Sequence, residues 1–100
     1  GDKAIEEEWD AVIELFRQAR PGYEKKIRER FPNLTDTEIR ICILTYAGFS
    51  IHDIAIILNR TDNTVQTYRT AMRKKMGIPH GGDIVKFLNR KIDLTPDIGQ

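Results

Sequence analysis

The stretch Thr61-Asp-Asn-Thr-Val-Gln-Thr-Tyr-Arg-Thr-Ala-Met-Arg-Lys-Lys-Met76 decides the fold of this chain. Its larger apolar side chains recur at the spacings i, i+3, i+7 and i+11, namely Val65, Tyr68, Met72 and Met76. Because an α-helix turns about 100° per residue, these positions form one stripe that a protein core can bury. The stretch therefore predicts an amphipathic helix over about 62–76.

The side of this helix opposite the stripe is polar and basic. It carries Asn63, Thr67, Thr70 and Lys74, and one flank carries Gln66, Arg69 and Arg73. Hydrogen-bonding side chains in the first turns and cations in the last turns suit a helix that enters a DNA major groove with its N-terminus first. The other interpretation is a helix face that is simply solvated.

Two short helices are predicted to precede this one. Thr35 and Glu38 form a capping box that begins a helix, which ends near Gly48. Ser50 and Asp53 repeat the pattern and begin a helix of about two turns, 51–58. The turn Asn59-Arg60 and the N-cap Thr61 then follow, with Gly77 as the C-cap of the third helix. The sequence thus predicts a turn-linked helix pair of the helix-turn-helix type.

The remaining segments complete an all-α prediction. Residues 1–33 read as an N-terminal helical hairpin that is broken at Pro21-Gly22, because proline removes a backbone donor. Residues 34–92 form the helix-turn-helix domain, and 93–100 a flexible tail. Asp83 caps a last helix whose apolar side chains exceed what so short a helix readily hides.

Composition and charge indicate a soluble domain with a basic half. The chain has 100 residues, 40% hydrophobic and 31% charged, with a net charge of +1. Residues 1–33 hold seven Lys/Arg against eight Asp/Glu, whereas 60–91 hold eight Lys/Arg against two Asp. Phosphate contacts depend on local cation density, so the second segment suits nucleic acid. The single Cys42 fits a reducing cytoplasm.

Other classes of protein are disfavoured. His52 and His80 lack the spaced partners of a zinc site, and no glycine-rich phosphate loop or catalytic arrangement is present. We therefore expect no enzyme, cofactor or metal. Arg40, His52 and Asp53 interrupt the aliphatic stretch 39–58, so we expect no membrane span.

The pattern of motifs resembles a known family of bacterial transcription regulators. Leu34-Thr35 with Glu38, Gly48-Phe49-Ser50, Ile54-Ala55 with Leu58, Thr61 with Thr64-Val65, and Lys75-Met76-Gly77 together resemble the LuxR-type (GerE-like) helix-turn-helix domain. The preceding Trp9, Phe16 and Phe31-Pro32, with the later Tyr68-Arg69, are similar to a variant common in Bacteroidetes. The resemblance implies a four-helix domain that serves as the output domain of a larger signal-responsive regulator.

Resemblance and face geometry together give roles to individual residues. The expected base contacts are Asn63, Gln66, Thr67 and Thr70. The expected phosphate contacts are Ser50, Arg60, Thr64, Tyr68, Arg69, Arg73 and Lys74. The family pairs through its last helix, so the resemblance also implies a weak homodimer on DNA, with Ile84, Phe87 and Leu88 at the interface. The chain departs from the family pattern at Asp53, Gln66 and Tyr68, where Glu, Lys and His are usual, so the DNA sequence that it reads is left open.

Two alternatives from other classes remain. Region 4 of a sigma factor has closely similar Ile-Ala and Thr-Val spacing, and it would contact RNA polymerase as well as promoter DNA. The ending Lys75-Met76-Gly77-Ile78 and the extra helix after Asp83 argue against it. A helical protein-interaction domain without DNA affinity is compatible with Asp62 and with the modest total charge.

Overall fold

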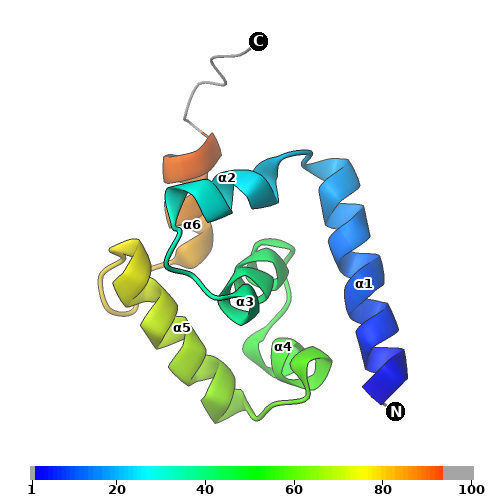
Figure 1. The fold of residues 1–100 in the computed structure, drawn as a ribbon. Coiled ribbons are helices and arrows are strands. Elements are labelled where there is room, and N and C mark those ends of the chain that lie inside the picture. Colours follow the sequence, from blue (N-terminus) through cyan, green and yellow to red (C-terminus); the bar gives the residue numbers. More distant parts are fainter. Residues whose placement is uncertain (1, 94–100) are drawn as a thin grey trace.

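A computed structural model describes residues 2–93, and side chains from 9 to 92. The described residues fold entirely into helices, arranged around one central helix (Figure 1). The elements in chain order are α1 (Asp2–Ala19), α2 (Tyr23–Arg30), α3 (Asp36–Tyr46), α4 (Ile51–Leu58), α5 (Asp62–Met76), α6 (Ile84–Leu88) and a π-helical turn, η1 (Asn89–Asp93). The all-α prediction is confirmed.

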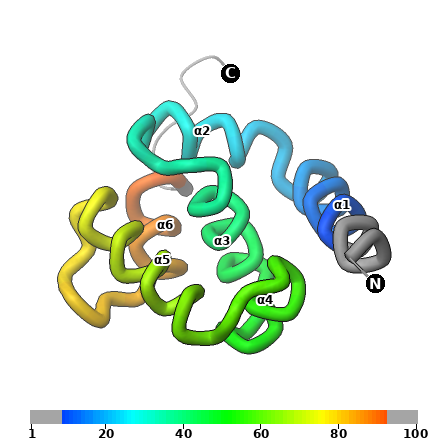
Figure 2. The backbone as a smooth tube through the Cα atoms, turned by 60° about the horizontal axis from the view of Figure 1, so that its bottom comes forward, coloured from blue at the N-terminus to red at the C-terminus, as the bar shows by residue number. Residues whose placement is uncertain are grey.

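Helix α3 lies at the centre of the core. Its residues Glu38, Ile39, Ile41, Cys42, Ile43 and Leu44 are all buried, while Asp36 and Arg40 are exposed, so the helix is enclosed around most of its circumference rather than on one face. Such a pattern marks a helix that other elements surround. Helices α1, α2, α4, α5 and α6 all pack against it, as the tube in Figure 2 shows. One hydrophobic cluster therefore joins the N-terminal helices to the helix-turn-helix segment.

The predicted caps are present at the starts of α3, α4, α5 and α6. Thr35 Oγ1 accepts from the Glu38 amide at 3.1 Å, and Glu38 Oε1 accepts from the Thr35 amide at 2.8 Å. Ser50, Thr61 and Asp83 accept in the same way from the amide three residues later. Each cap satisfies a backbone donor that the helix leaves unpaired, which contributes roughly 1 kcal/mol.

The two predicted N-terminal helices are present as α1 and α2. Gly22 takes the left-handed conformation (φ 79°) and turns the chain sharply after Pro21, so that α1 and α2 run in different directions (Figure 1). Helix α1 lies against α4 and α3, and α2 lies against α3 and η1. The apolar stripes of both helices therefore pack mainly on the following core.

An aromatic group fixes the corner between α1 and α2. The rings of Phe16, Tyr23 and Tyr46 lie 5.0–5.9 Å apart, and the Arg20 guanidinium lies over Tyr23 and Tyr46 at 4.7 and 5.3 Å. Arg20 also donates to the Tyr46 hydroxyl. These ring and cation contacts hold the start of α2 against the end of α3.

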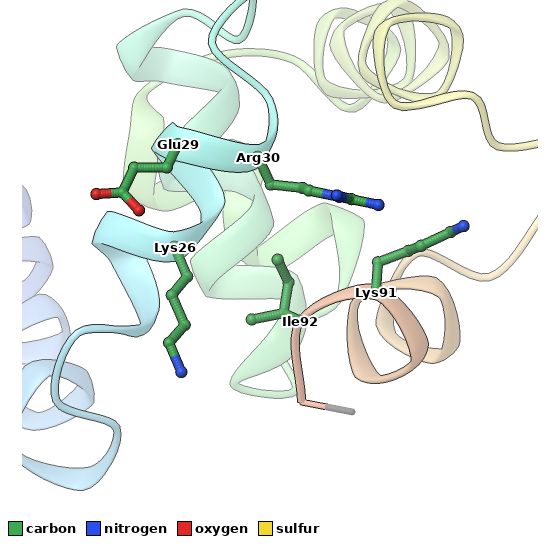
Figure 3. A pocket seen from close by; sticks show the side chains of 5 residues that line it. All are labelled: Lys26, Glu29, Arg30, Lys91 and Ile92. Carbon is green, nitrogen blue, oxygen red and sulfur yellow. The ribbon is translucent and has the colours of Figure 1, made fainter. Parts of the chain in front are cut away.

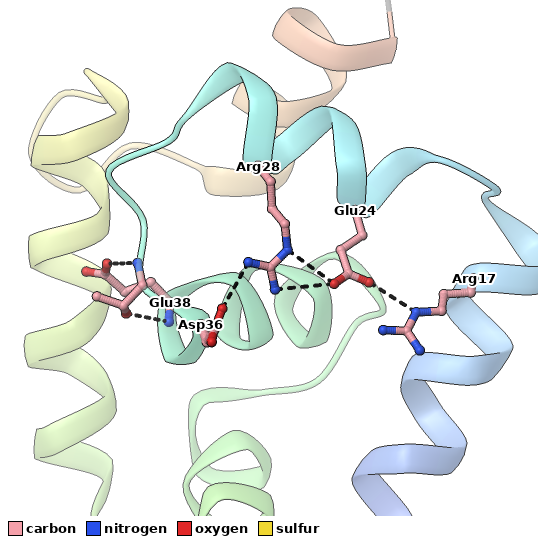
Figure 4. A network of polar contacts seen from close by, with 6 residues as sticks. Arg17, Glu24, Arg28, Asp36 and Glu38 are labelled. Carbon is pink, nitrogen blue, oxygen red and sulfur yellow. Dashed lines mark hydrogen bonds and ion pairs between the residues drawn. The ribbon is translucent and has the colours of Figure 1, made fainter.

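A chain of exposed ion pairs connects the outer surfaces of α1, α2 and α3 (Figure 4). Arg17 Nε lies 3.2 Å from Glu24 Oε1, Glu24 pairs with Arg28, and Arg28 Nη1 lies 2.9 Å from Asp36 Oδ1. Exposed pairs of this kind contribute little individually, up to about 1 kcal/mol each. They orient α2 across the first turn of α3.

Candidate nucleic-acid interface

The turn between α4 and α5 sets the direction of the second helix. Asn59 ends α4 in the left-handed conformation (φ 55°), which asparagine tolerates better than most residues, and the Arg60 amide donates to Ala55 O at 2.8 Å. Thr61 then caps α5. Buried Ala55 and Val65 lie in the core beneath the pair, where small side chains permit close approach. The predicted helix-turn-helix is thereby formed.

The predicted base contacts lie together on the outer side of α5. Asn63, Gln66, Thr67 and Thr70 are exposed, and no described part of the chain covers them. Thr67 Oγ1 donates to Asn63 O at 3.0 Å and Thr70 Oγ1 donates to Gln66 O at 3.1 Å. Because the hydroxyl hydrogens are used inside the helix, the two threonines can offer a neighbouring molecule their methyl groups and oxygen lone pairs.

The basic residues of α5 divide between two sides of the helix. Lys74 is exposed beside the outer polar residues. Arg69, Arg73 and Lys75 instead bond within the domain, on the inner side or its edges. Arg69 and Arg73 are among the predicted phosphate contacts, and their bonds within the domain depend on tertiary contacts that periodicity does not reveal.

Arg69 is half-buried and contacts α3. Its Nη1 donates to Thr45 Oγ1 at 3.4 Å, and its Nε is buried without a hydrogen-bond partner among the described residues. Burial lowers the pKa of this guanidinium from its usual value, and the charge of Arg73 lowers it further. Arg69 lies four residues after buried Val65, so it occupies the edge of the core stripe. Its guanidinium is therefore held at the edge of the core against α3.

Arg73 and Lys75 anchor the C-terminal half of α5. Arg73 Nε donates to Gly82 O at 3.0 Å, which ties α5 to the loop before α6. Lys75 Nζ lies 2.6 Å from Glu38 Oε1, so the capping box of α3 is also bonded to the last turn of α5. Gly77 then ends the helix with a positive φ of 78°. These bonds hold the inner side of α5 against α3 and against the loop before α6.

Glu38 is a functional residue that sequence reasoning identified only as a cap. Its side chain is 3% exposed, and burial raises the pKa of its carboxyl. The bonds from Lys75 and from the Thr35 amide outweigh burial, so the pKa ends below its usual value. A charge so deeply buried beside apolar residues is unfavourable unless it is paired. The presence of both Glu38 and Lys75 was visible in the sequence, but their separation of 37 residues concealed the pair.

The remaining predicted phosphate contacts lie near the starts of α4 and α5. Ser50 and Thr64 are engaged locally, since Ser50 Oγ accepts from the Asp53 amide and Thr64 Oγ1 lies 2.9 Å from Thr61 Oγ1. Arg60 is exposed in the turn between the helices. The ring of Tyr68 packs, partly buried, against the core. The backbone amides at these helix starts add donors that favour an anion.

One contact between α4 and α5 was missed by sequence reasoning. His52 Nδ1 lies 3.1 Å from Asp62 Oδ1, so the first turns of the two helices are joined on the exposed side. The residues are ten apart and follow no motif, which is why only the folded chain shows the contact. The pair adds a second connection beside the turn.

Comparison with known proteins identifies the helix-turn-helix segment. The family model "Bacterial regulatory proteins, luxR family" matches residues 32–88, which is more than half of the chain. The chain belongs to the luxR family of bacterial regulatory proteins. No curated protein and no solved structure matches it. The matched range covers α3 to α6 and leaves α1, α2 and η1 outside.

Membership of the luxR family gives the general function. The chain is a helix-turn-helix domain that binds DNA and regulates transcription, and it is not an enzyme. Among the described residues, no helix is both long and apolar enough to cross a membrane. In the same part of the chain, no group of three His, Cys, Asp or Glu side chains is arranged to hold a metal ion. Cys42 is buried, and burial raises the pKa of its thiol to about 12, which makes it unreactive.

The residues expected at a luxR-type dimer interface need correction. Ile84 and Leu88 are 1% and 0% exposed, because α6 packs against α3 and η1. Their side chains are therefore core residues and are not available to a second copy. Phe87 is half-buried, and its ring lies 6.0 Å from that of Phe31 at the end of α2. The apolar excess of the last helix is thus covered largely by the same chain.

Proposed function

We propose that this luxR-family domain binds double-stranded DNA sequence-specifically by placing α5 in the major groove. The observation that carries the proposal is the exposed outer side of α5, which the anchored inner side holds in a fixed orientation. Gln66 would pair with an adenine edge, and Thr67 and Thr70 would contact thymine methyl groups. Asn63, in the first turn, would reach an adjacent base.

Phosphate contacts would surround this base-reading surface. Lys74 and Arg60 supply exposed cations, and the amide groups near Ser50 and Thr64 supply neutral donors. The Tyr68 hydroxyl would reach a phosphate while its ring stays on the core. Arg73 would contribute its long-range charge rather than a direct bond, and Arg69 would act as an anchor.

The regulatory context extends the proposal beyond the domain. We infer that the chain works in the bacterial cytoplasm as the output domain of a larger signal-responsive regulator. On DNA, two copies would pair weakly through the exposed part of α6 around Phe87, and would present α5 to half-sites about one helical turn apart. Contact with RNA polymerase, as in region 4 of a sigma factor, would appear as retention of the core polymerase in a pull-down.

In vitro selection of duplexes from a random pool tests the proposal directly. We expect enrichment of one motif, and affinity that falls steeply with salt. A motif with two related half-sites would indicate pairing, and a single half-site would contradict it. Failure to retain any duplex at low salt would overturn DNA recognition by α5 and favour a protein-interaction role. The Gln66→Ala variant supplies the control, because selection with it should yield a motif changed at one position.

A further inference from the structure

Helix α2 and η1 lie at the opposite end of the molecule from the α4–α5 turn (Figure 1), and a basic cavity lies between them. The cavity has a volume of about 300 Å³ and lies between α2 and η1. Its lining residues are Lys26, Glu29, Arg30, Lys91 and Ile92. Because α2 and η1 are about 60 residues apart in the sequence, only the tertiary structure creates this site.

The charge of the cavity is predominantly positive. Three of its five lining residues are cations, from both of its walls. Figure 3 shows Arg30 and Lys91 projecting in the same direction from α2 and η1, while Glu29 points away from them. The Glu29 carboxylate is 65% exposed and lies 3.9 Å from Nζ of Lys25, a residue that does not line the cavity. Among the described lining residues, the one carboxylate is therefore partnered away from the cavity.

The basic residues of α2 differ in how they are neutralised. Arg28 bonds to both Asp36 and Glu24, and Lys25 pairs with Glu29. Arg30, on the same helix, makes no ion pair or hydrogen bond with any residue whose side chain the structure describes. A guanidinium offers a planar fork of donors that matches phosphate oxygens. Arg30 is thus available for an anion at the mouth of the cavity.

The cavity also has an apolar floor, which Ile92 forms. Ile92 is 4% exposed. The ring of Phe31, the residue after Arg30, lies 6.0 Å from the ring of Phe87. Lys91 Nζ lies 5.9 Å from the centre of the Phe87 ring, which orients the ammonium group. An anion beside this floor would be partly shielded from water, so its attraction to the cations would be stronger than on an open surface.

We propose that the α2–η1 cavity binds the phosphate group of a small phosphorylated molecule. Arg30 and Lys91 would hold the phosphate from opposite walls, Lys26 would add a third positive charge, and the organic part would lie on Ile92. A volume of about 300 Å³ is at the lower end of pockets that hold small molecules. None of the described residues that line the cavity belongs to α5, so this ligand would not occupy the DNA-binding surface.

Titration with inorganic phosphate, followed by backbone amide NMR of the full chain, tests the proposal. We expect saturable shifts at Arg30, Lys91 and Ile92, and no saturable shift with chloride at equal ionic strength. The double variant Arg30→Gln with Lys91→Met removes two charge-assisted contacts and should weaken phosphate binding about tenfold or more. The control Lys25→Met removes one positive charge, against two in the double variant, from a residue of α2 outside the cavity, and should change affinity less than about twofold.

Two results would overturn the proposal. One is a set of shifts that phosphate and chloride produce alike, and the other is an equal loss of affinity in Lys25→Met and in the double variant. Circular dichroism of each variant separates loss of binding from loss of fold. Failure of α5 to recognise DNA would leave the phosphate titration unchanged, so the two proposals fail independently.

A parallel measurement of DNA binding distinguishes a small phosphorylated molecule from the DNA backbone as the source of the bound phosphate. The selected duplex should bind wild type and the double variant with affinities within about threefold of each other, apart from the loss of distant charge. A loss of tenfold or more, together with competition by inorganic phosphate, would identify the DNA backbone as the ligand and overturn the assignment to a small molecule.

Discussion

Polar and basic residues occur both at the edges of the inner side of α5 and on its outer side, but their surroundings differ. On the inner side and its edges, Arg69 and Lys75 bond to Thr45 and Glu38 of α3. On the outer side, Gln66 and Lys74 have no such partners and remain exposed. A cation on this helix is therefore a structural anchor or a DNA contact according to its angle relative to the core. The residue type alone does not distinguish these two roles.

The largest expected difference between the inner and outer sides of α5 is in the free energy of unfolding. Met72 is fully buried, so Met72→Ala should lower the free energy of unfolding by about 2–5 kcal/mol, from lost burial and a residual cavity. The matched change Thr70→Ala, two residues earlier on the exposed side, should change it by less than about 0.5 kcal/mol. Chemical denaturation measures both. Equal losses of unfolding free energy in the two variants would mean that the outer side of α5 also contributes packing to the fold.

The second-largest effect is expected at the Lys75–Glu38 ion pair, which joins α5 to α3. Lys75→Met leaves the buried Glu38 carboxylate without its cation, and should cost about 2 kcal/mol of unfolding free energy. Adding Glu38→Gln should recover part of the loss, because the uncompensated charge is removed. A double-mutant cycle measured by denaturation gives the coupling. Additive losses in the two single variants would show that the pair does not stabilise the domain.

The third-largest effect is expected for base contact by Gln66. It should change the affinity for DNA and leave the free energy of unfolding unchanged. Gln66→Ala should cost roughly 1–3 kcal/mol on the preferred duplex and much less on a duplex changed at the corresponding base pair. Its unfolding free energy should stay near wild type, because Gln66 is exposed. Titration of both duplexes by fluorescence anisotropy measures the difference. An equal loss on every duplex would assign Gln66 to backbone contact instead.

Salt dependence sharpens the comparison of cations. Lys74→Met should weaken binding to all duplexes and reduce the slope of log affinity against log salt by about 1. Arg69→Met should leave that slope almost unchanged, because its guanidinium lies on Thr45. Binding measured over a series of salt concentrations distinguishes them. If Arg69→Met changed the slope as much as Lys74→Met does, the inward position of Arg69 would not hold in the complex.

The pH dependence should be the smallest effect. The pKa of Glu38 is lowered in the folded domain from its usual value of 4.5. The carboxylate therefore stabilises the fold above about pH 4.5, and this contribution is lost as pH falls through the lowered pKa. Denaturation of wild type and Glu38→Gln between pH 3 and 7 should converge at the acidic end. A constant difference across that range would contradict the role of the ionised carboxylate.

Local physics made much of the fold predictable. The caps at Thr35, Ser50, Thr61 and Asp83 were all predicted, because each bond joins residues only three apart. The exposure of Gln66, Thr67 and Thr70 also follows from helical periodicity. The site was less predictable at its basic residues, since polarity alone does not tell an anchored arginine from a free one.

The sequence by itself determined where α3, α4, α5 and α6 begin, which stripe of α5 is buried, and which family the motifs match. Only the tertiary structure decided the path of α1 and α2, the burial of Ile84 and Leu88, and the partners of Arg69, Arg73 and Lys75. Capping and periodicity act within a few residues along the chain. Burial and ion pairing depend on side chains that the folded core brings together from segments tens of residues apart.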